Sequence, residues 1–424
     1  MSAGRSILAG GLSRPRAPRF LLPALMLLAL GGCGTAQLAD TSCGGTLRVA
    51  PAETSPSATD AAAPTVRTVI VEPRQMESRV AEAVAAEAAT GAGGPVRLKV
   101  LMLSAGGQYG AFGAGFLRGW ADRPGGRPGF DLITGVSAGA ILAPAVHAGP
   151  RFGGALDVWN GLDQRDVYRL RIPSLLFGAP SIASVAPLER LVTRSITPDL
   201  LEALAARERA GDRLFVSAVN LDTSRAEIFD LGALAASSLS PEAKGACLRE
   251  AVLASAAIPI LMPPRQIEGA PYADGGLRDQ VFLTSVENGR LAGGRSSGRP
   301  VEVEATLIVN GALDPPKGAV KRTLFGFGAR SVLTLSDEVL RESVLDVVEF
   351  VEERPNWTLR AMVAPDMDLS ACLDAGEGEG GQFDACITGA LYAEGRRAAT
   401  APRIDWMTSR DLARRAGRYG AGDQ

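Results

Sequence analysis

Residues 130–149, FDLITGVSAGAILAPAVHAG, decide the fold class that we expect for this chain. Residues 130–133 are typical of a strand, and residues 138–147 are typical of a helix. Between them lies Gly135-Val136-Ser137-Ala138-Gly139. This order fits a nucleophile elbow, in which a sharp turn pushes the serine hydroxyl outward and the flanking glycines tolerate the crowded backbone. The segment therefore indicates an α/β fold with Ser137 as the candidate nucleophile.

The Gly-x-Ser-x-Gly pattern by itself is weak evidence, because 50 of the 424 residues are glycine. A second copy, residues 294–298, places Ser296 in the same pattern. That copy lies in ENGRLAGGRSSGRP, a polar stretch that we expect to be a loop, with no strand before it and no apolar helix after it. The context therefore favours Ser137 over Ser296.

The whole chain contains one histidine, His147, and this limits the chemistry. Zinc sites and Ser-His-Asp triads normally use histidine, and no histidine follows His147 to complete the usual hydrolase order. His147 lies ten residues after Ser137 on the expected helix, about 15 Å away, and we expect it to face the last helix carbonyls. We therefore expect no metal or other cofactor, and the base must be a carboxylate, a lysine or nothing.

An anion site is predicted upstream, where the apolar run LKVLML at residues 98–103 leads into Ser104-Ala105-Gly106-Gly107-Gln108-Tyr109-Gly110. A strand, a glycine turn and a helix start point free backbone N–H groups at one spot. The glycine spacing fits neither the dinucleotide fingerprint nor a P-loop, which favours an oxyanion over a nucleotide phosphate. Glycines that only allow close helix packing remain the alternative.

A third segment supplies a candidate carboxylate. Residues 247–264, CLREAVLASAAIPILMPP, are typical of a helix broken at Pro259, and Asp274-Gly275-Gly276 follows shortly afterwards. Two glycines after an aspartate let the backbone turn and leave the carboxylate exposed to a distant serine. Taken alone, this tripeptide is most often a plain turn.

These segments, in this order, resemble the patatin-like phospholipase family. The family has a Gly-rich oxyanion loop after its first strand, a Gly-x-Ser-x-Gly elbow, an Ala-Ser-x-Ala-x-Pro helix end and an Asp-Gly-Gly/Ala turn. The corresponding motifs here are residues 104–110, 135–139, 254–259 and 274–276, and the similarity covers about residue 96 to at least residue 308. Residues 213–231 also look like the family's strand pair.

The resemblance implies a three-layer α/β/α fold with a mainly parallel central sheet and the site at the carboxyl ends of its strands. It implies that Ser137 is the nucleophile and that Asp274 takes its proton directly, as a dyad without histidine. The N–H groups of Gly106, Gly107 and Gln108 would hold the oxyanion. The glycines that it assigns to the motifs are Gly110, Gly135, Gly139, Gly275 and Gly276.

Two departures from the family pattern keep three functions open. Ala105 replaces the first loop glycine, which requires a negative φ there, and Tyr109 replaces a basic residue that could steer an anionic substrate. The first function is a membrane-anchored acyl hydrolase of lipid esters, either a phospholipase A or lysophospholipase or a lipid esterase, that forms an acyl-enzyme. The second is a catalytically idle lipoprotein that binds lipid or an envelope partner. The third is an esterase of soluble substrates.

The amino terminus resembles a bacterial lipoprotein signal. Residues 1–32 carry four arginines and the apolar run FLLPALMLLAL, which is too short to span a bilayer. The run ends in Leu30-Gly31-Gly32-Cys33, similar to a lipobox, so we expect Cys33 to carry the lipid that holds the chain on a membrane. Because Gly34 is not the aspartate that favours inner-membrane retention, the outer membrane is slightly preferred, with the domain in the periplasm or at the cell surface.

The remaining chain divides into three expected parts. Residues 33–95 form a tether and a lead-in helix, residues 96–365 the acyl hydrolase domain, and residues 366–424 a C-terminal extension. We expect a disulfide between Cys372 and Cys386 in that extension, whereas Cys43 and Cys247 could both be free. Residues 172–178 are apolar and form either a buried loop, which is favoured, or a flap that touches lipid. The formal charge of −2 gives no electrostatic argument for a nucleic-acid partner.

Overall fold

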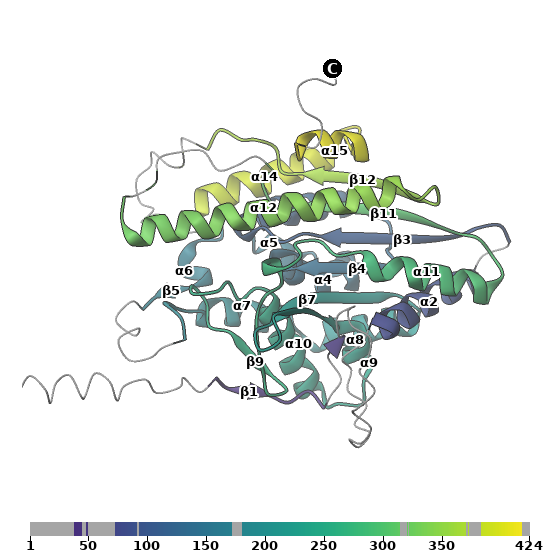
Figure 1. Ribbon diagram of the computed structural model, residues 1–424, viewed down its shortest axis with the longest axis horizontal. Coiled ribbons are helices and arrows are strands. Elements are labelled where there is room, and N and C mark those ends of the chain that lie inside the picture. Colours follow the sequence, from purple (N-terminus) through teal and green to yellow (C-terminus); the bar gives the residue numbers. More distant parts are fainter. Residues whose placement is uncertain are drawn as a thin grey trace, which may run out of the picture.

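The computed structural model describes residues 38–44, 48–49, 73–90, 93–171, 180–313, 320, 322–369, 372 and 383–417. Its central sheet has the order β1-β9-β10-β7-β4-β3-β11-β12-β13, and β8 pairs with β7 and with β2 (Figure 1). The middle five strands are parallel: β7 (Arg213–Asn220), β4 (Leu132–Val136), β3 (Val96–Leu103), β11 (Val301–Val309) and β12 (Trp357–Val363).

The strands around this centre make the sheet mixed. The antiparallel ones are β8 (Arg225–Asp230) and β10 (Ala270–Asp274) on β7, β9 (Arg265–Ile267) on β10, β13 (Met407–Thr408) on β12 and β2 (Arg48–Val49) on β8. Strand β1 (Asp40–Thr41) runs parallel to β9. The expected mainly parallel central sheet is confirmed.

Helices cover both faces of the sheet because its central strands are apolar on both sides. In β3, Leu101 and Leu103 pack in one hydrophobic core, and Val100 and Met102 pack in the other. Helices α3 (Gly110–Ala121), α4 (Ala138–Ala148), α8 (Pro198–Arg209), α10 (Pro241–Ser255) and α14 (Ala385–Thr400) bury side chains in the first core. Helices α2 (Pro73–Thr90), α11 (Thr284–Ser297), α12 (Leu324–Glu352) and α15 (Ser409–Arg415) do so in the second. The three-layer α/β/α fold is confirmed.

Smaller elements complete the described chain. The helices are α5 (Gly154–Asp157), α6 (Gln164–Val167), α7 (Ala186–Ser195) and α9 (Leu231–Ala236), and the strands β5 (Arg169–Leu170) and β6 (Ala183–Ser184) pair with each other. Three 3₁₀ turns are η1 (Gly107–Tyr109), η2 (Pro150–Phe152) and η4 (Gly275–Leu277). No helix in these described ranges combines the length and the apolar composition needed to cross a bilayer. Residues 172–178, for which we expect a buried loop or a flap, lie outside the described ranges.

The segment before residue 96 contributes to the fold rather than only leading into it. Met76, Val80 and Val84 on α2 are fully buried against the sheet. Helix α2 packs closely on α11, where a Cβ on Gly289 would lie 2.5 Å from the Cβ of Val80. Because β1 already pairs with β9 at Asp40, the sheet begins only seven residues after Cys33.

The segment after residue 382 is also built into the domain. Helix α14 lies so close to α3 that a Cβ on Gly395 would be 2.1 Å from the carbonyl oxygen of Phe112. Strand β13 extends the sheet beyond β12, and Leu412 on α15 is fully buried. The C-terminal residues 383–417 therefore complete both helical layers.

The described residues form two disulfides, one between cysteines close in the sequence and one between distant segments. Cys372 and Cys386 form the disulfide that the sequence predicts. Cys43 and Cys247, for which the sequence left free thiols open, also form a disulfide across 204 residues. This second bond links the end of β1 to α10, so the first strand is held covalently to the domain.

Candidate active site

Ser137 occupies the sharp turn that joins β4 to α4. Its backbone has φ 52° and ψ −117°, a left-handed conformation that a non-glycine residue rarely adopts. The turn needs glycine on both sides, because a Cβ on Gly135 would lie 2.7 Å from the carbonyl oxygen of Gly139. A Cβ on Gly139 would lie 2.2 Å from the carbonyl oxygen of Leu103. The geometry is that of a nucleophile elbow at the carboxyl end of a parallel strand.

Asp274 meets Ser137 at this turn, although 137 residues separate them. The Ser137 hydroxyl donates a hydrogen bond of 2.7 Å to Oδ2 of Asp274, and the Gly276 N–H donates one of 2.8 Å to Oδ1. The aspartate ends β10, directly before η4. Gly275 allows the chain to turn there, because a Cβ would lie 2.4 Å from the carbonyl oxygen of Ser217.

The environment of Asp274 makes its carboxylate a stronger base than an exposed aspartate. Burial raises the pKa of Asp274 to about 6, against the hydrogen bonds from Ser137 and Gly276, which lower it. The carboxylate is therefore ionised at neutral pH, with a pKa close enough to the working pH to accept a proton in a reaction.

Neither His147 nor Ser296 competes for these roles. His147 is buried at the end of α4, and within the described part of the chain neither ring nitrogen has a hydrogen-bond partner, so the expected contact with the last carbonyls is absent. Burial, with the nearby Arg207 and Arg127, lowers the pKa of His147 to about 3. Ser296 is exposed in the last turn of α11, so the expectation of a loop there was wrong, because this polar stretch continues a helix that packs on α2.

The glycine turn after β3 is pressed against the end of β11. A Cβ on Gly106 would lie 1.3 Å from the carbonyl oxygen of Asn310, so no other residue fits there. The Asn310 side-chain N–H₂ donates a 2.8 Å bond to the Ser104 carbonyl, and the Asn310 backbone N–H donates one of 2.8 Å to the Ser104 hydroxyl. Asn310 thereby clamps the loop to the neighbouring strand.

The loop to which the sequence assigns an oxyanion leads into the 3₁₀ turn η1. Gly107 and Gln108 begin η1, and the first N–H groups of a helical turn have no partner within it. Gly107 and Ser137 line the same cavity. Ala105 is buried and is not among the residues with positive φ, so the condition that the sequence placed on this alanine is met.

Ser255 holds the Ser137 turn in place from the end of α10. The Ser137 backbone N–H donates a 3.0 Å hydrogen bond to the Ser255 hydroxyl, which in turn donates one of 2.6 Å to the Ser217 carbonyl. Ser255 is fully buried, and α10 ends there, four residues before the helix-breaking Pro259. The motif that the sequence singled out therefore ties the elbow to β7.

We expect Ser255→Ala to slow turnover about 10-fold without moving the pH dependence, because it leaves a buried amide and a buried carbonyl without partners. Such losses cost about 1–3 kcal/mol each and loosen the elbow. Steady-state kinetics on a lipid ester, with Ser296→Ala as the exposed control, measure the effect. Wild-type kcat in Ser255→Ala would contradict a positioning role.

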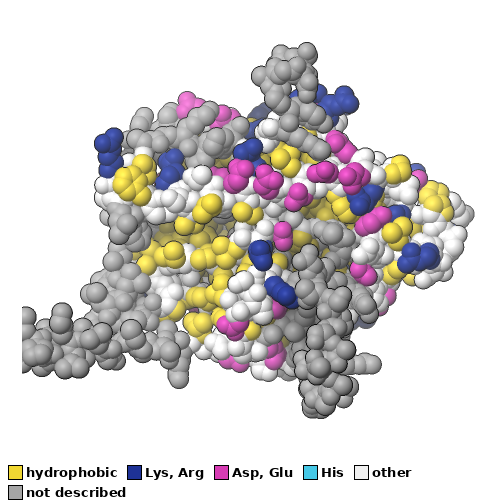
Figure 2. All heavy atoms as spheres, viewed as in Figure 1, with side chains coloured by type: hydrophobic (Ala, Val, Ile, Leu, Met, Phe, Trp, Pro, Cys, Tyr) yellow, Lys and Arg dark blue, Asp and Glu magenta, His cyan; other side chains and the backbone are white. Residues whose placement is uncertain are grey.

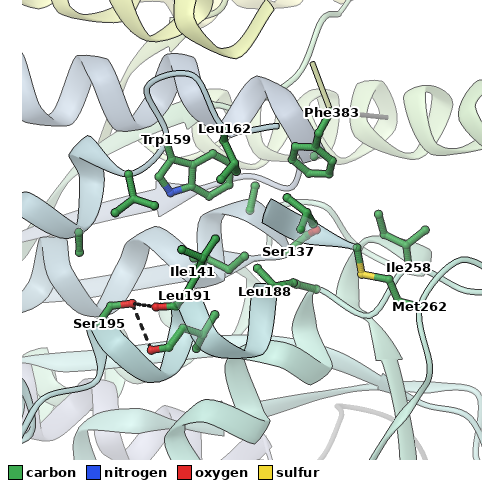
Figure 3. Close-up of a pocket in the computed structure, with 17 residues that line it drawn as sticks. Ser137, Ile141, Trp159, Leu162, Leu188, Leu191, Ser195, Ile258, Met262 and Phe383 are labelled. Atoms are coloured by element: carbon green, nitrogen blue, oxygen red, sulfur yellow. Dashed lines mark hydrogen bonds between the residues drawn. The ribbon is translucent and has the colours of Figure 1, made fainter. Parts of the chain in front are cut away.

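An apolar cavity opens at Ser137 (Figure 3). Trp159, Leu162 and Phe383 lie on one side of the serine, and Ile258 and Met262 lie on another. Including its open mouth, the cavity has a volume of about 640 Å³. A second apolar cavity shares four lining residues with the first, namely Ile141, Ala155, Val192 and Ser195. Together they extend the apolar space away from the serine.

Comparison with known families agrees with this site. Residues 101–286 match the family model of patatin-like phospholipases. The chain contains a patatin-like phospholipase domain. The match spans the loop at Gly106, the elbow at Ser137 and the turn at Asp274, and at family level it supports a lipid acyl hydrolase. No curated protein matches the chain.

The patatin-like domain departs from its family most clearly at Tyr109. Its side chain is half-buried beside the loop, and burial, with the carboxylates of Asp337 and Asp366, raises its pKa. The rim therefore carries a phenol near two acids where the family has a cation. Among the described residues, no group of three histidine, cysteine, aspartate or glutamate side chains is placed to hold a metal ion.

Two residues that contribute to the patatin-like site were not predicted from the sequence. Asn310 follows β11, and Phe383 precedes α14, both beyond residue 286 where the family match ends. The position of Asn310 directly after the apolar residues Leu307, Ile308 and Val309 is the signal that could have identified it.

Proposed function

We propose that the domain is a serine acyl hydrolase of lipid esters in which Ser137 and Asp274 form the catalytic dyad. The observation that carries the proposal is the 2.7 Å hydrogen bond from a hydroxyl in a strained elbow to a buried carboxylate. A serine needs such a base, and the single histidine of the chain does not reach it.

In the acylation step, Asp274 takes the Ser137 proton as the serine oxygen attacks the ester carbonyl. The new C–O bond places a negative charge on the former carbonyl oxygen, which the Gly107 and Gln108 amides, and the Gly106 amide beside them, stabilise. The bond to the leaving alcohol then breaks, and the alcohol oxygen receives the proton from Asp274. The product of this half-reaction is an acyl-Ser137 ester.

Deacylation repeats the same steps with water. Asp274 takes a proton from water, the hydroxide oxygen attacks the acyl carbonyl, and the Ser137 oxygen leaves with the proton that Asp274 returns. The fatty acid is released and both side chains regain their starting states. A base with a pKa of about 6 suits both halves because it is ionised at neutral pH and still holds a proton transiently.

The cavity supports an acyl chain as the group that is bound. Its lining is hydrophobic apart from Ser137, Ser195 and the backbone at Gly107, and the Ser195 hydroxyl bonds to the Leu191 and Val192 carbonyls of its own helix. A lining of this kind suits the hydrocarbon of a phospholipid, a lysophospholipid or a neutral lipid ester. Tyr109 stands where the family has a basic residue, and the carboxylates of Asp337 and Asp366 lie near it, which favours esters whose head group needs no cation at this position.

We also propose that Cys33, outside the described residues, carries the lipid that anchors the chain to a membrane of the cell envelope, with the outer membrane preferred. The apolar run and the lipobox-like Leu30-Gly31-Gly32-Cys33 support this assignment. Mass spectrometry of the membrane-extracted protein tests it.

Labelling with a fluorophosphonate tests the dyad directly, because this probe reacts with an activated serine. We expect the full chain in detergent to label and Ser137→Ala to give no label, while Ser296→Ala labels as the wild type does. A folded wild-type chain that resists the probe would favour an idle lipid-binding lipoprotein. Labelling together with turnover of soluble esters but not of phospholipid or lysophospholipid micelles would favour a soluble-substrate esterase.

A further inference from the structure

Helix α12 extends beyond the surface that it covers. Leu340, Val344 and Val348 are fully or almost fully buried on the sheet, at helical spacing. Residues 327–336, which we name the α12 overhang, have no buried side chain among those described. In Figure 1 this end of α12 projects on the side to which the arrowheads of β3 and β12 point. The overhang therefore stands at the edge of the sheet that carries the active site.

The overhang is apolar although it faces solvent. Its exposed fractions are 51% for Phe327, 42% for Val332, 41% for Leu333 and 68% for Leu335. The segment has a basic residue, Arg330, and no acid, whereas acids recur from residue 337 onward. Figure 2 shows acidic side chains along the rest of α12 and hydrophobic and basic side chains at its free end. Such a helix end needs an apolar partner.

The end of the overhang at Ser336 lies at the rim of the active site. The Gln280 side-chain N–H₂ donates to the Ser336 carbonyl, and the Gln280 backbone N–H donates a 3.0 Å bond to the Ser343 hydroxyl. The Gln280 carbonyl accepts a 3.1 Å bond from the N–H of Ala105, in the oxyanion loop. Two bonded residues thus connect the overhang to the site.

A second exposed apolar side chain lies beside the cavity. Ile260 is 65% exposed with a φ of 70°, and its chain neighbours Ile258 and Met262 line the cavity at Ser137. The rare backbone conformation costs free energy, and exposure of the isoleucine side chain to water does not offset this cost. Apolar groups therefore stand near the mouth on two elements.

We propose that the α12 overhang and Ile260 insert into the interfacial region of a lipid bilayer and present the mouth of the cavity to it. This inference rests on the proposed function, because a bilayer is where a lipid ester substrate resides. A solvent-exposed apolar helix end suits that partner. Asp40 follows Cys33 by seven residues, which can span at most about 24 Å, so a lipid on Cys33 would keep the domain at the surface.

Tryptophan reporters test the insertion independently of activity. In the full chain, bound to phosphatidylcholine and phosphatidylglycerol vesicles at 3:1, we expect Leu335→Trp fluorescence to shift to the blue and to be quenched by brominated lipid. The matched control is Leu291→Trp, which replaces a 41% exposed leucine on α11, labelled at the other end of the molecule in Figure 1. Since the N-terminal segment is the same in both variants, a difference reports local insertion. Equal quenching in both would overturn the proposal.

Turnover provides the second arm. We expect Phe327→Glu with Leu335→Glu to lower turnover of vesicle lipid about 10-fold and to change turnover of a soluble short-chain ester less than twofold. Leu291→Glu should change neither rate. Unchanged vesicle turnover in the double variant would overturn the proposal. It would also be overturned if the wild type formed a dimer that the double variant dissociated, and brominated lipid did not quench Leu335→Trp. A wild-type chain inactive on every ester would contradict the proposed function instead, and the quenching would still report on the overhang.

Discussion

Asp274→Asn is expected to lower kcat/KM about 10⁴-fold and, above pH 7, to make the folded chain more stable than the wild type. Asparagine can still accept the Ser137 hydrogen bond at its amide oxygen, so the elbow keeps its partner. It cannot take the proton, and the loss of a general base costs on the order of 10⁴-fold. Activity and stability should therefore change in opposite directions.

The gain in stability follows from the pKa of the buried carboxyl group. Asp274 has a pKa of about 6 in the folded chain and an ordinary value of 3.8. Its protonated form therefore favours folding below pH 3.8, and this contribution is lost as the pH rises through about 6. Above that pH the wild type carries the cost of a buried charge, on the order of 1–3 kcal/mol, which asparagine avoids.

Two measurements and one control variant check this prediction. Wild-type kcat/KM should rise with pH to a plateau above about 6, the pKa of Asp274. Urea unfolding at pH 5 and pH 8 should show an advantage of Asp274→Asn that is larger at pH 8. The control is Asp279→Asn, an exposed carboxylate five residues away, which should retain activity. An active Asp274→Asn, or a wild-type profile flat from pH 5 to pH 8, would remove Asp274 from the mechanism.

Gly106→Ala is expected to lower kcat about 10²- to 10³-fold, or to prevent folding. The new Cβ would lie 1.3 Å from the Asn310 carbonyl oxygen, which belongs to the backbone and cannot rotate away. The oxyanion loop must therefore leave the end of β11, and the Gly107 and Gln108 amides move with it. Misplacing a single oxyanion donor typically costs 10²- to 10³-fold.

Gly154→Ala is the matched control, because a Cβ there has no atom within 4 Å. It should fold and turn over substrate as the wild type does. Circular dichroism and thermal unfolding separate loss of the fold from loss of the site. If Gly106→Ala does not fold, Asn310→Ala, which removes only the side-chain bond to the Ser104 carbonyl, should show an intermediate loss of kcat. A folded, fully active Gly106→Ala would show that this loop does not hold the oxyanion.

The elbow and the Asp-Gly-Gly turn could be located from the sequence because their geometry is local. A positive φ at Ser137 and the close contacts at Gly135, Gly139 and Gly275 each require particular residues within a short segment. The central strands were recognisable for the same reason, since apolar runs such as residues 98–103 must be covered on both sides. Because no histidine follows position 147, the sequence excluded an ordinary triad before the structure was known.

The contacts that join distant segments required the tertiary structure. The Asp274 oxygen lies 2.7 Å from the Ser137 hydroxyl only because β10 pairs with β7 and β7 pairs with β4. Likewise, Asn310 reaches Ser104 because β11 pairs with β3. The spacing of residues in the sequence does not predict these pairings, because each depends on which strands become neighbours in the folded sheet.

The borders of the domain and the exposure of the apolar end of α12 also required the tertiary structure. From the sequence we predicted that α2 leads into the domain and that residues 366–424 extend from it, although both α2 and α14 pack on the domain. The sequence by itself located Ser137 and Asp274 as candidates, because the stereochemistry of each turn depends on adjacent residues. The tertiary structure alone decided which apolar faces are covered, because burial depends on packing between segments far apart in the chain.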